Sequence, residues 1–184
     1  MKKYFLLLLL IIISACSSSE ETLKVEIPSD LDTYSVNSHS RKFSVNIPEN
    51  WKNISDNVET IFDIWLISSD DKTVIGFIPL NIDNTIDEDD KLKLLSKFEL
   101  EALKSKNADI NTEDIFTLID IDGITASPLT YEIDGKKFNL IVFGKDNVYY
   151  KSLAYFGNGY KPTDDEMEDL IDLQELVISS AKFR

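Results

Sequence analysis

The chain contains a single cysteine, Cys16, among 184 residues. One thiol cannot form an intramolecular disulfide, a Cys-x-x-Cys redox motif or a thiolate zinc site, so these classes of site are excluded. The folded state therefore depends on a packed apolar core. Hydrophobic residues make up 43% of the chain, which is enough to build such a core.

Basic residues are scarce, because 19 Lys and Arg stand against 33 Asp and Glu, a formal net charge of -14 at pH 7. Proteins that bind nucleic acid use Lys and Arg to displace counterions from the phosphate backbone. A surface this acidic repels phosphate. We therefore expect no binding to DNA or RNA.

The sequence also has few of the residues that catalysis requires. His39 is the only histidine and precedes the first clear strand, where we expect neither packing nor an orienting acid to hold a general base. The sequence has no Gly-x-Ser-x-Gly elbow and no phosphate-binding glycine loop, and Gly157-Asn158-Gly159 is typical of a turn. We expect a non-catalytic protein without a cofactor.

Asp120 and Asp122 keep an enzymatic alternative open. They lie two residues apart on a predicted strand, so their carboxylates share a face, as in an enzyme that acts on polysaccharides. Asp122 also belongs to an Asp-Gly turn, which explains its presence without catalysis.

An acidic loop before a predicted helix could form an irregular, weak Ca²⁺ site. The sequence does not match an EF-hand, because Glu88 and Leu94 occupy the positions of the glycine and of the bidentate glutamate. We expect no metal here and regard four carboxylates as weak candidate ligands: Asp83, Asp87, Asp89 and Asp90.

The longest apolar run, from Phe5 to Ile13, is short. As a helix its nine residues would span about 13 Å, whereas a bilayer core requires about 20 residues. Lys2 and Lys3 precede the run. This pattern is typical of a signal peptide and not of a transmembrane helix.

The run ends in Ile13-Ser14-Ala15-Cys16, which resembles the bacterial lipobox with Ile in place of Leu. The resemblance implies that residues 1–15 are removed as a lipoprotein signal peptide. It also implies that Cys16 carries a diacylglycerol and an acyl chain such as palmitate, which together give a stable membrane anchor. The alternatives are ordinary secretory cleavage, which would leave a free thiol, and a cysteine that stands at this position by chance. Removal of residues 1–15 leaves 17 basic and 33 acidic residues, a net charge of -16.

The lipobox resemblance implies a location in the cell envelope. Ser17, which follows the cysteine, implies the outer membrane if the cell is Gram-negative. The segment Ser19-Glu20-Glu21 resembles acidic signals for surface export, so the periplasmic face and the cell surface both stay open.

Residues 16–38 are polar at their start and are interpreted as a lipidated, flexible stalk, followed by one domain over residues 39–184. Within the stalk, apolar residues alternate with polar ones at Leu23, Val25, Ile27, Tyr34 and Val36. Partial docking of the stalk on the edge of the domain is therefore an alternative.

The first half of the domain predicts three strands and a helix. Residues 43–47 alternate as a strand that Pro48 ends, and Trp51 behind it is expected in the core. Residues 61–67 and 73–80 predict a hairpin. Residues 89–107 predict a helix with a lysine face and an apolar face. Leu100 falls outside the apolar face. This face consists of Leu92, Leu94, Leu95, Phe98, Ala102 and Leu103.

The second half predicts an antiparallel meander over residues 115–121, 124–133, 137–143 and 148–156. Asp122-Gly123 and Asp134-Gly135 are typical of the two-residue turns that join such strands. Pro128 places its strand at an edge or at a bulge.

The last predicted element is a helix that begins with a capping box at Thr163 and Glu166. We expect its apolar stripe, from Met167 through Ala181, to close one face of the sheet. Its acidic stripe then faces water. This stripe consists of Asp165, Glu168, Asp169, Asp172 and Glu175.

Three segments resemble the PsbP/Mog1-like family: the opening Phe43-Ser44-Val45-Asn46-Ile47-Pro48-Glu49-Asn50-Trp51, the turn Ile121-Asp122-Gly123-Ile124-Thr125-Ala126, and the closing Ile178-Ser179-Ser180-Ala181-Lys182-Phe183. The resemblance implies an α+β fold in which helices cover a mainly antiparallel sheet, an α/β/α sandwich. Pro48, Trp51 and Gly123 then have structural roles.

Members of this family mostly act as binding modules. We therefore expect a monomeric, lipid-anchored accessory protein that binds another envelope protein. Two alternatives stay open. One is a small-ligand or Ca²⁺ carrier with a cleft between sheet and helices, and the other is the polysaccharide-active enzyme that would use Asp120 and Asp122.

Overall fold

The computed structural model describes residues 28–55, 60–82, 86, 88–110, 117–157 and 159–184. Its elements in chain order are β1 (Leu31–Asn37), β2 (Phe43–Pro48), β3 (Lys52–Asn53), β4 (Ile64–Ile67), β5 (Thr73–Leu80), α2 (Glu88–Ser105), β6 (Asp109–Ile110), β7 (Ile119–Ile121), β8 (Ile124–Ile133), β9 (Lys136–Lys145), β10 (Val148–Phe156), α3 (Asp164–Ser179) and β11 (Lys182–Phe183).

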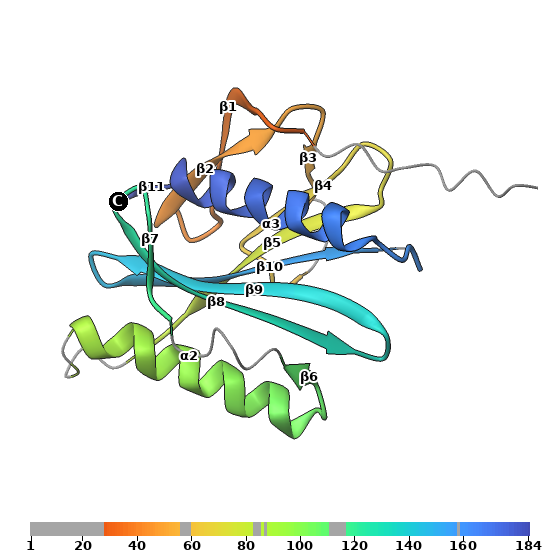
Figure 1. The fold of residues 1–184 in the computed structure, drawn as a ribbon. Coiled ribbons are helices and arrows are strands. Elements are labelled where there is room, and N and C mark those ends of the chain that lie inside the picture. The colour runs from red at the N-terminus through yellow and green to blue at the C-terminus, as the bar shows by residue number, and fades with distance from the viewer. Residues whose placement is uncertain (1–27, 56–59, 83–85, 87, 111–116, 158) are drawn as a thin grey trace, which may run out of the picture.

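Antiparallel pairing joins these strands into two sheets. In the described ranges, the main sheet has the order β3-β4-β5-β10-β9-β8-β6, with β7 also paired to β8, and the small sheet has the order β1-β2-β11. Helix α3 and the small sheet lie on one face of the main sheet, and α2 lies on the other (Figure 1). The expected α+β architecture of helices on a mainly antiparallel sheet is confirmed.

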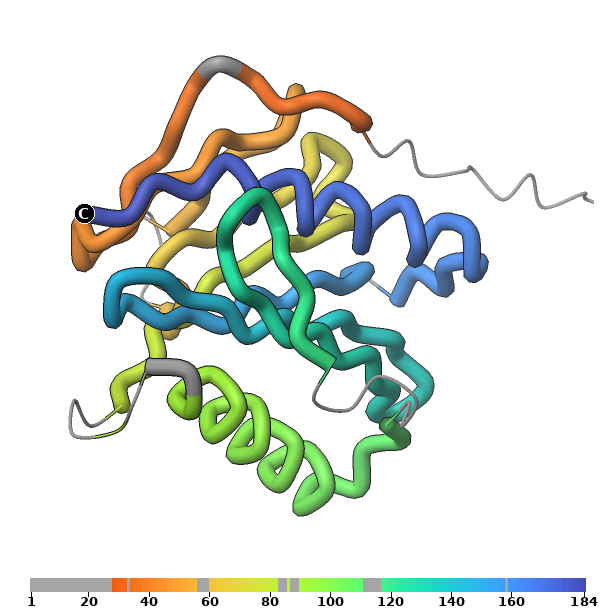
Figure 2. Tube along the Cα trace, turned by 60° about the vertical axis from the view of Figure 1, so that its left-hand side comes forward, coloured from red at the N-terminus to blue at the C-terminus, as the bar shows by residue number. Residues whose placement is uncertain are grey.

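Tight turns produce the meander from β7 to β10. Asp122 and Gly123 have φ of 52° and 79°, and Asp134 and Gly135 have φ of 53° and 73°. These left-handed conformations are those that two-residue hairpin turns require. Figure 2 shows the hairpin of β7 and β8 standing beside α3.

Pro128 lies in a stretch of β8 that pairs on one side only. It is opposite Ile141 of β9, whereas β7 pairs with residues 124–126 and β6 with residues 131–132. Among the described residues no strand lies on the other side of Pro128. On that side, the lack of an N–H at Pro128 leaves no strand without a hydrogen-bond donor. The expected edge position is confirmed.

Helix α3 begins at the expected capping box. The Thr163 Oγ1 accepts from the Glu166 N–H at 3.2 Å, and the Glu166 carboxylate accepts from the Thr163 N–H at 2.8 Å. The buried side of the helix contains Leu170, Val177 and Ile178, and the acidic stripe is exposed apart from Glu175, which is half-buried. As expected, α3 covers one face of the main sheet.

Two apolar clusters fill the molecule. The α3-side core joins α3 and β2 to the main sheet and includes Phe43, Phe77 and Phe143, all fully buried. Trp51 belongs to this core and is 7% exposed. The α2-side core joins α2 to β8 and β9, with Leu140 and Val142 at its centre.

The structure corrects the expected domain boundary. Residues 31–37 form β1, which pairs with β2, so a stalk that extends to residue 38 and a domain that begins at residue 39 are both wrong. The alternative, docking of the stalk on the domain edge, holds for this segment, because Val36 is 5% exposed and packs in the α3-side core.

The structure also corrects the apolar face of α2. Leu100 is 3% exposed, whereas Phe98, expected to be buried, is 60% exposed and Ala102 is exposed. The helix is turned so that Ser96 and Leu100 face Ser127 and Leu129 of β8 across a small cavity. Burial on α2 therefore follows the side that faces the sheet and not the centre of the apolar arc.

Within the described ranges, no helix is both long enough and apolar enough to cross a membrane.

Candidate functional site

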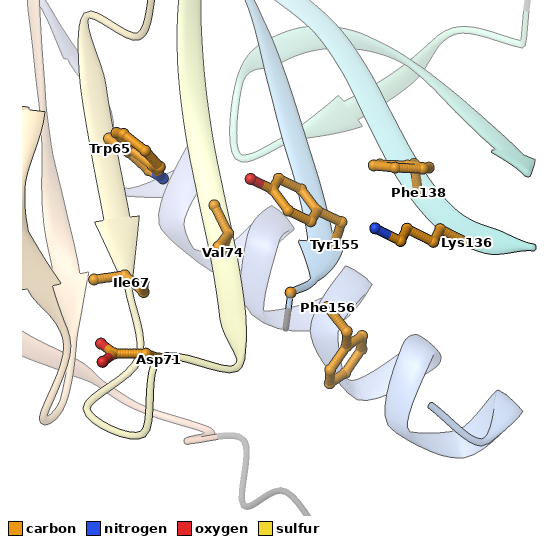
Figure 3. A pocket seen from close by; sticks show the side chains of 9 residues that line it. Trp65, Ile67, Asp71, Val74, Lys136, Phe138, Tyr155 and Phe156 are labelled. Carbon is orange, nitrogen blue, oxygen red and sulfur yellow. The ribbon is translucent and has the colours of Figure 1, made fainter. Parts of the chain in front are cut away.

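Helix α2 covers only part of its face of the main sheet. Its core cluster includes residues of β8, β9 and β10, and the ion pair of Glu99 with Lys151 of β10 (2.8 Å) lies beside this cluster. The outer surfaces of β4, β5 and the end of β10 form an open groove of about 560 Å³ (Figure 3). Its lining consists of Trp65, Ile67, Asp71, Val74, Lys136, Phe138, Tyr155, Phe156 and Gly157. We call it the aromatic groove.

Strand register brings the floor of the aromatic groove together. Ile67 is opposite Val74, Val74 is opposite Tyr155, and Tyr155 is opposite Phe138. Because directly opposed residues point to the same side of a sheet, these four side chains form one row across β4, β5, β10 and β9.

Aromatic pairs stand on both sides of β5. On the β4 side, the rings of Phe62 and Trp65 have centroids 5.3 Å apart. On the β10 side, Tyr155 and Phe138 are 5.4 Å apart. Phe138 also stacks on Tyr131 at 5.1 Å with an interplanar angle of 9°. The groove thus has aromatic walls and the smaller Val74 between them.

Gly76 permits this arrangement on β5. A Cβ atom at this position would lie 2.3 Å from Cε1 of Phe62, so only glycine leaves room for the Phe62 ring above the strand. Phe62 in turn packs against Trp65. Gly76 therefore positions one aromatic wall of the groove.

Three polar groups of the groove have no hydrogen-bond or ion-pair partner within the described part of the chain. The Trp65 indole Nε1 is buried without an acceptor. No bond joins the Tyr155 hydroxyl or the Lys136 ammonium to another described residue. The Tyr155 hydroxyl is a neutral donor at pH 7, and burial raises its pKa further above the ordinary value. Asp71, in the turn between β4 and β5, lies at the other end of the groove from Lys136 (Figure 3).

A second polar cluster lies inside the molecule, around Asp63. Its carboxylate accepts from the Ser40 N–H at 3.0 Å, from the Ser40 hydroxyl at 2.7 Å and from the Tyr150 hydroxyl at 2.6 Å. Burial, and secondly the bond to Asp63, raises the pKa of Tyr150 to about 12. Every oxygen of this cluster has a partner, so the cluster holds the loop before β2 on the main sheet.

The residues singled out from the sequence lie elsewhere. Asp120 Oδ1 accepts from the Gly123 N–H at 3.0 Å, and Asp122 occupies the turn with positive φ, so both have a structural role in the β7–β8 hairpin. His39 is exposed, and its backbone N–H donates to the Asp63 carbonyl at 3.3 Å. None of the three lines the aromatic groove.

The proposed Ca²⁺ ligands are only partly within the described ranges. Asp83 and Asp87 lie outside them, as does the side chain of Asp89, and Asp90 is exposed. In the described part of the chain, no three His, Cys, Asp or Glu side chains come together as metal ligands. Cys16 and the signal peptide also lie outside the described residues.

Comparison with solved structures identifies the fold. The solution structure of the cyanobacterial PsbP protein of Synechocystis aligns with a TM-score of 0.55 at 12% identity, over 82% of this chain and 92% of that chain. The Ran-binding protein Mog1p of Saccharomyces cerevisiae aligns with a TM-score of 0.51 at 9% identity, over 84% and 96%. A Mog1 mutant aligns with a TM-score of 0.55 at 10% identity, over 83% and 96%.

The chain therefore has the PsbP/Mog1-like fold that the three sequence segments indicated. At these identities the alignments establish the fold alone. No family model and no curated protein sequence matches the chain.

Proposed function

We propose that the chain is a non-catalytic accessory module of the cell envelope, anchored by lipid at Cys16, which binds an envelope protein through the aromatic groove. The groove carries the proposal, because an open, aromatic-lined face of a sheet is typical of a binding surface. The yeast protein of the same fold is described as a Ran-binding protein, an example of protein binding by this fold.

The chemistry of the groove supports binding more than catalysis. A general acid or base must lie within hydrogen-bond reach of the reacting atoms. The ionisable side chains in the lining are Asp71 and Lys136 at opposite ends, and Tyr155, which is protonated at neutral pH and whose pKa burial raises further. The paired carboxylates Asp120 and Asp122 belong to a turn outside the groove.

The anchor at Cys16 is compatible with an accessible groove. The described chain begins at Pro28, which lies beside Asp169 and Asp172 of α3. The groove is on the other side of the main sheet, the side of α2 (Figure 1). Residues 17–27 span at most about 38 Å when extended, so the tether leaves the groove free to face away from its membrane.

In-cell photo-crosslinking tests this proposal. A photoreactive phenylalanine is placed at Tyr155 in the groove or, as matched control, at Tyr34 of β1, which is 62% exposed and outside the groove. We expect adducts to a specific envelope protein from position 155 and not from position 34. Equal adducts from both positions, or none from position 155, would contradict the proposed binding surface.

A second candidate is a small-ligand carrier of the envelope. The groove volume of about 560 Å³ favours it, since small-molecule sites commonly measure about 300–1,000 Å³. The Ca²⁺ version of this function requires the loop around Asp83 and Asp87. A melting temperature that rises with added Ca²⁺ and not with Mg²⁺ would support that version, and an unchanged one would exclude it.

A further inference from the structure

We infer that the aromatic groove binds a neutral sugar, with a pyranose ring packed against its aromatic walls. The inference rests on the small-ligand function proposed above and names its ligand class. Three observations on the groove lead to it: the placement of the rings, the free donors, and the charge.

The rings are placed as a sugar requires. The C–H groups on one face of a pyranose are weakly positive and pack on the negative face of an aromatic ring. Trp65 and Tyr155 extend from β4 and β10, which β5 separates, so their backbones are about 10 Å apart. Val74 of β5, 4% exposed, is the apolar floor between them (Figure 3).

The free polar groups require acceptors. Trp65 Nε1 is a buried donor, and no described residue accepts a hydrogen bond from it. Buried donors without an acceptor are rare, because leaving one unpaired is unfavourable in free energy. Figure 3 shows the indole nitrogen of Trp65 and the hydroxyl of Tyr155 on the sides of their rings that face each other. A ligand rich in hydroxyl and ring oxygens supplies acceptors to both donors.

Charge disfavours an anionic ligand. The formal net charge of -14 repels anions, including acidic polymers and phosphates. The lining itself holds one acidic and one basic side chain, Asp71 and Lys136, at opposite ends of the groove. A neutral ligand does not meet the barrier that the net charge sets against anions.

The backbone disfavours a peptide strand as occupant. Peptides that extend a sheet bind to a free strand edge through main-chain hydrogen bonds. The strands beneath the groove have neighbours on both sides: β4 lies between β3 and β5, β5 between β4 and β10, and β10 between β5 and β9. The groove therefore offers side chains and not main-chain partners.

Calorimetric titration of the full chain, purified from membranes in a detergent without a sugar headgroup, tests the inference. The probes are the neutral trisaccharides of glucose with β-1,4 and α-1,4 links and of N-acetylglucosamine, with trigalacturonic acid as the acidic counterpart. We expect at least one neutral trisaccharide to bind, and the acidic one to show no binding.

Variants locate the site. Tyr155→Ala should weaken binding at least 10-fold. Trp65→Phe and Tyr155→Phe keep a ring, remove one donor each and should weaken it 3- to 10-fold. Tyr34→Ala, outside the groove, should bind as the wild type does. A melting curve of each variant confirms folding.

Two results would overturn the inference. One is the absence of binding for all three neutral probes. The other is that the single variants Tyr155→Phe and Trp65→Phe both bind a probe as tightly as the wild type does. If these occur while position 155 still crosslinks to an envelope protein, the sugar site is wrong and the accessory module stands. If neither crosslinks nor sugars are found, both proposals fail.

Discussion

The Tyr150 hydroxyl donates a hydrogen bond to Oδ2 of Asp63 over 2.6 Å, inside the α3-side core. Tyr150 is fully buried and Asp63 is 7% exposed. The same carboxylate accepts two hydrogen bonds from Ser40. Asp63 precedes β4 and Ser40 precedes β2, so one buried carboxylate connects two loops to β10 at the centre of the main sheet.

Loss of this bond should destabilise the protein. Tyr150→Phe removes a donor to a charged acceptor and leaves the ring contact with Phe43 (4.1 Å between centroids) in place. Hydrogen bonds to charged groups contribute about 1.5–3 kcal/mol, so we expect that decrease in the free energy of unfolding. Urea unfolding measures it. Tyr34→Phe, at a 62% exposed site, is the matched control, and equal stability of the two variants would refute the role of the pair.

The buried tyrosines should make stability depend on alkaline pH. Burial raises the pKa of Tyr150 to about 12, and burial with the nearby Glu99 raises the pKa of Tyr131 to about 12. A tyrosine is neutral when protonated, and its pKa in the unfolded chain is about 10. Its contribution is thus complete below pH 10 and is lost between pH 10 and 12, because the unfolded state then releases protons that the folded state retains.

Unfolding free energies at pH 9, 10 and 11 check this dependence. The wild type should lose stability steeply above pH 10. Tyr131→Phe should lose less over the same interval, because one of the two linked protons is absent. Parallel curves for wild type and variant would mean that Tyr131 titrates normally in the folded protein.

Much of the fold was predictable because its signals are local. The capping box at Thr163 and the Asp122-Gly123 turn act through bonds and dihedral angles within a few residues, so sequence reveals them. The faces of α2 were not predictable, because Phe98 and Leu100 are both apolar. Only the way in which α2 packs against β8 and β9 decides which of them is buried.

The aromatic groove was not predicted at all. Trp65 lies on β4, and Phe138 and Tyr155 lie on the later hairpin of β9 and β10. In the sequence, each is simply one more apolar residue of an alternating strand. Strand order and register, which depend on long-range pairing, bring them together. The available signal was weak: Gly76 inside an apolar strand indicates a close approach, here that of the Phe62 ring.

The two tryptophans should respond differently to truncation. Trp51 is 7% exposed and lies in the α3-side core. Trp51→Ala should lower the free energy of unfolding by about 3–5 kcal/mol, because the cavity left by the missing ring cannot collapse fully. Trp65 is half-buried in the groove wall, so Trp65→Ala should cost less. Thermal melts of both variants compare them. An unchanged melting temperature in Trp51→Ala would show that this residue is not a core anchor.

Cys16 should carry the lipid anchor. Cells that express the chain should incorporate labelled palmitate into the wild type and not into Cys16→Ala, since the thioether requires the thiol. The variant should also leave the membrane fraction. Cys16→Ser, which keeps the size of the side chain, is a second variant with the same expected loss. Equal labelling of the wild type and Cys16→Ala would refute lipidation at this residue.

Docking of α3 is testable with two charge changes placed two residues apart. Leu170 is fully buried against the main sheet, and Asp172 is exposed on the acidic stripe. Leu170→Asp removes apolar burial and places a carboxylate among the apolar side chains of the α3-side core, so it should cost more than about 3 kcal/mol. Asp172→Lys alters only the solvated face and should stay within about 0.5 kcal/mol of the wild type.

Denaturant melts of a chain that begins at residue 17 measure the difference, since both apolar cores lie after residue 30. A series of buried side-chain hydrogen bonds also holds α3 in place. The Gln174 amide accepts from Asn139 at 2.8 Å and donates to Ser152 at 2.9 Å, so any shift of α3 costs the free energy of these bonds. The helix cannot move to hydrate an aspartate at position 170 without breaking these bonds. Equal stability of Leu170→Asp and Asp172→Lys would therefore mean that α3 is not packed on the sheet in solution.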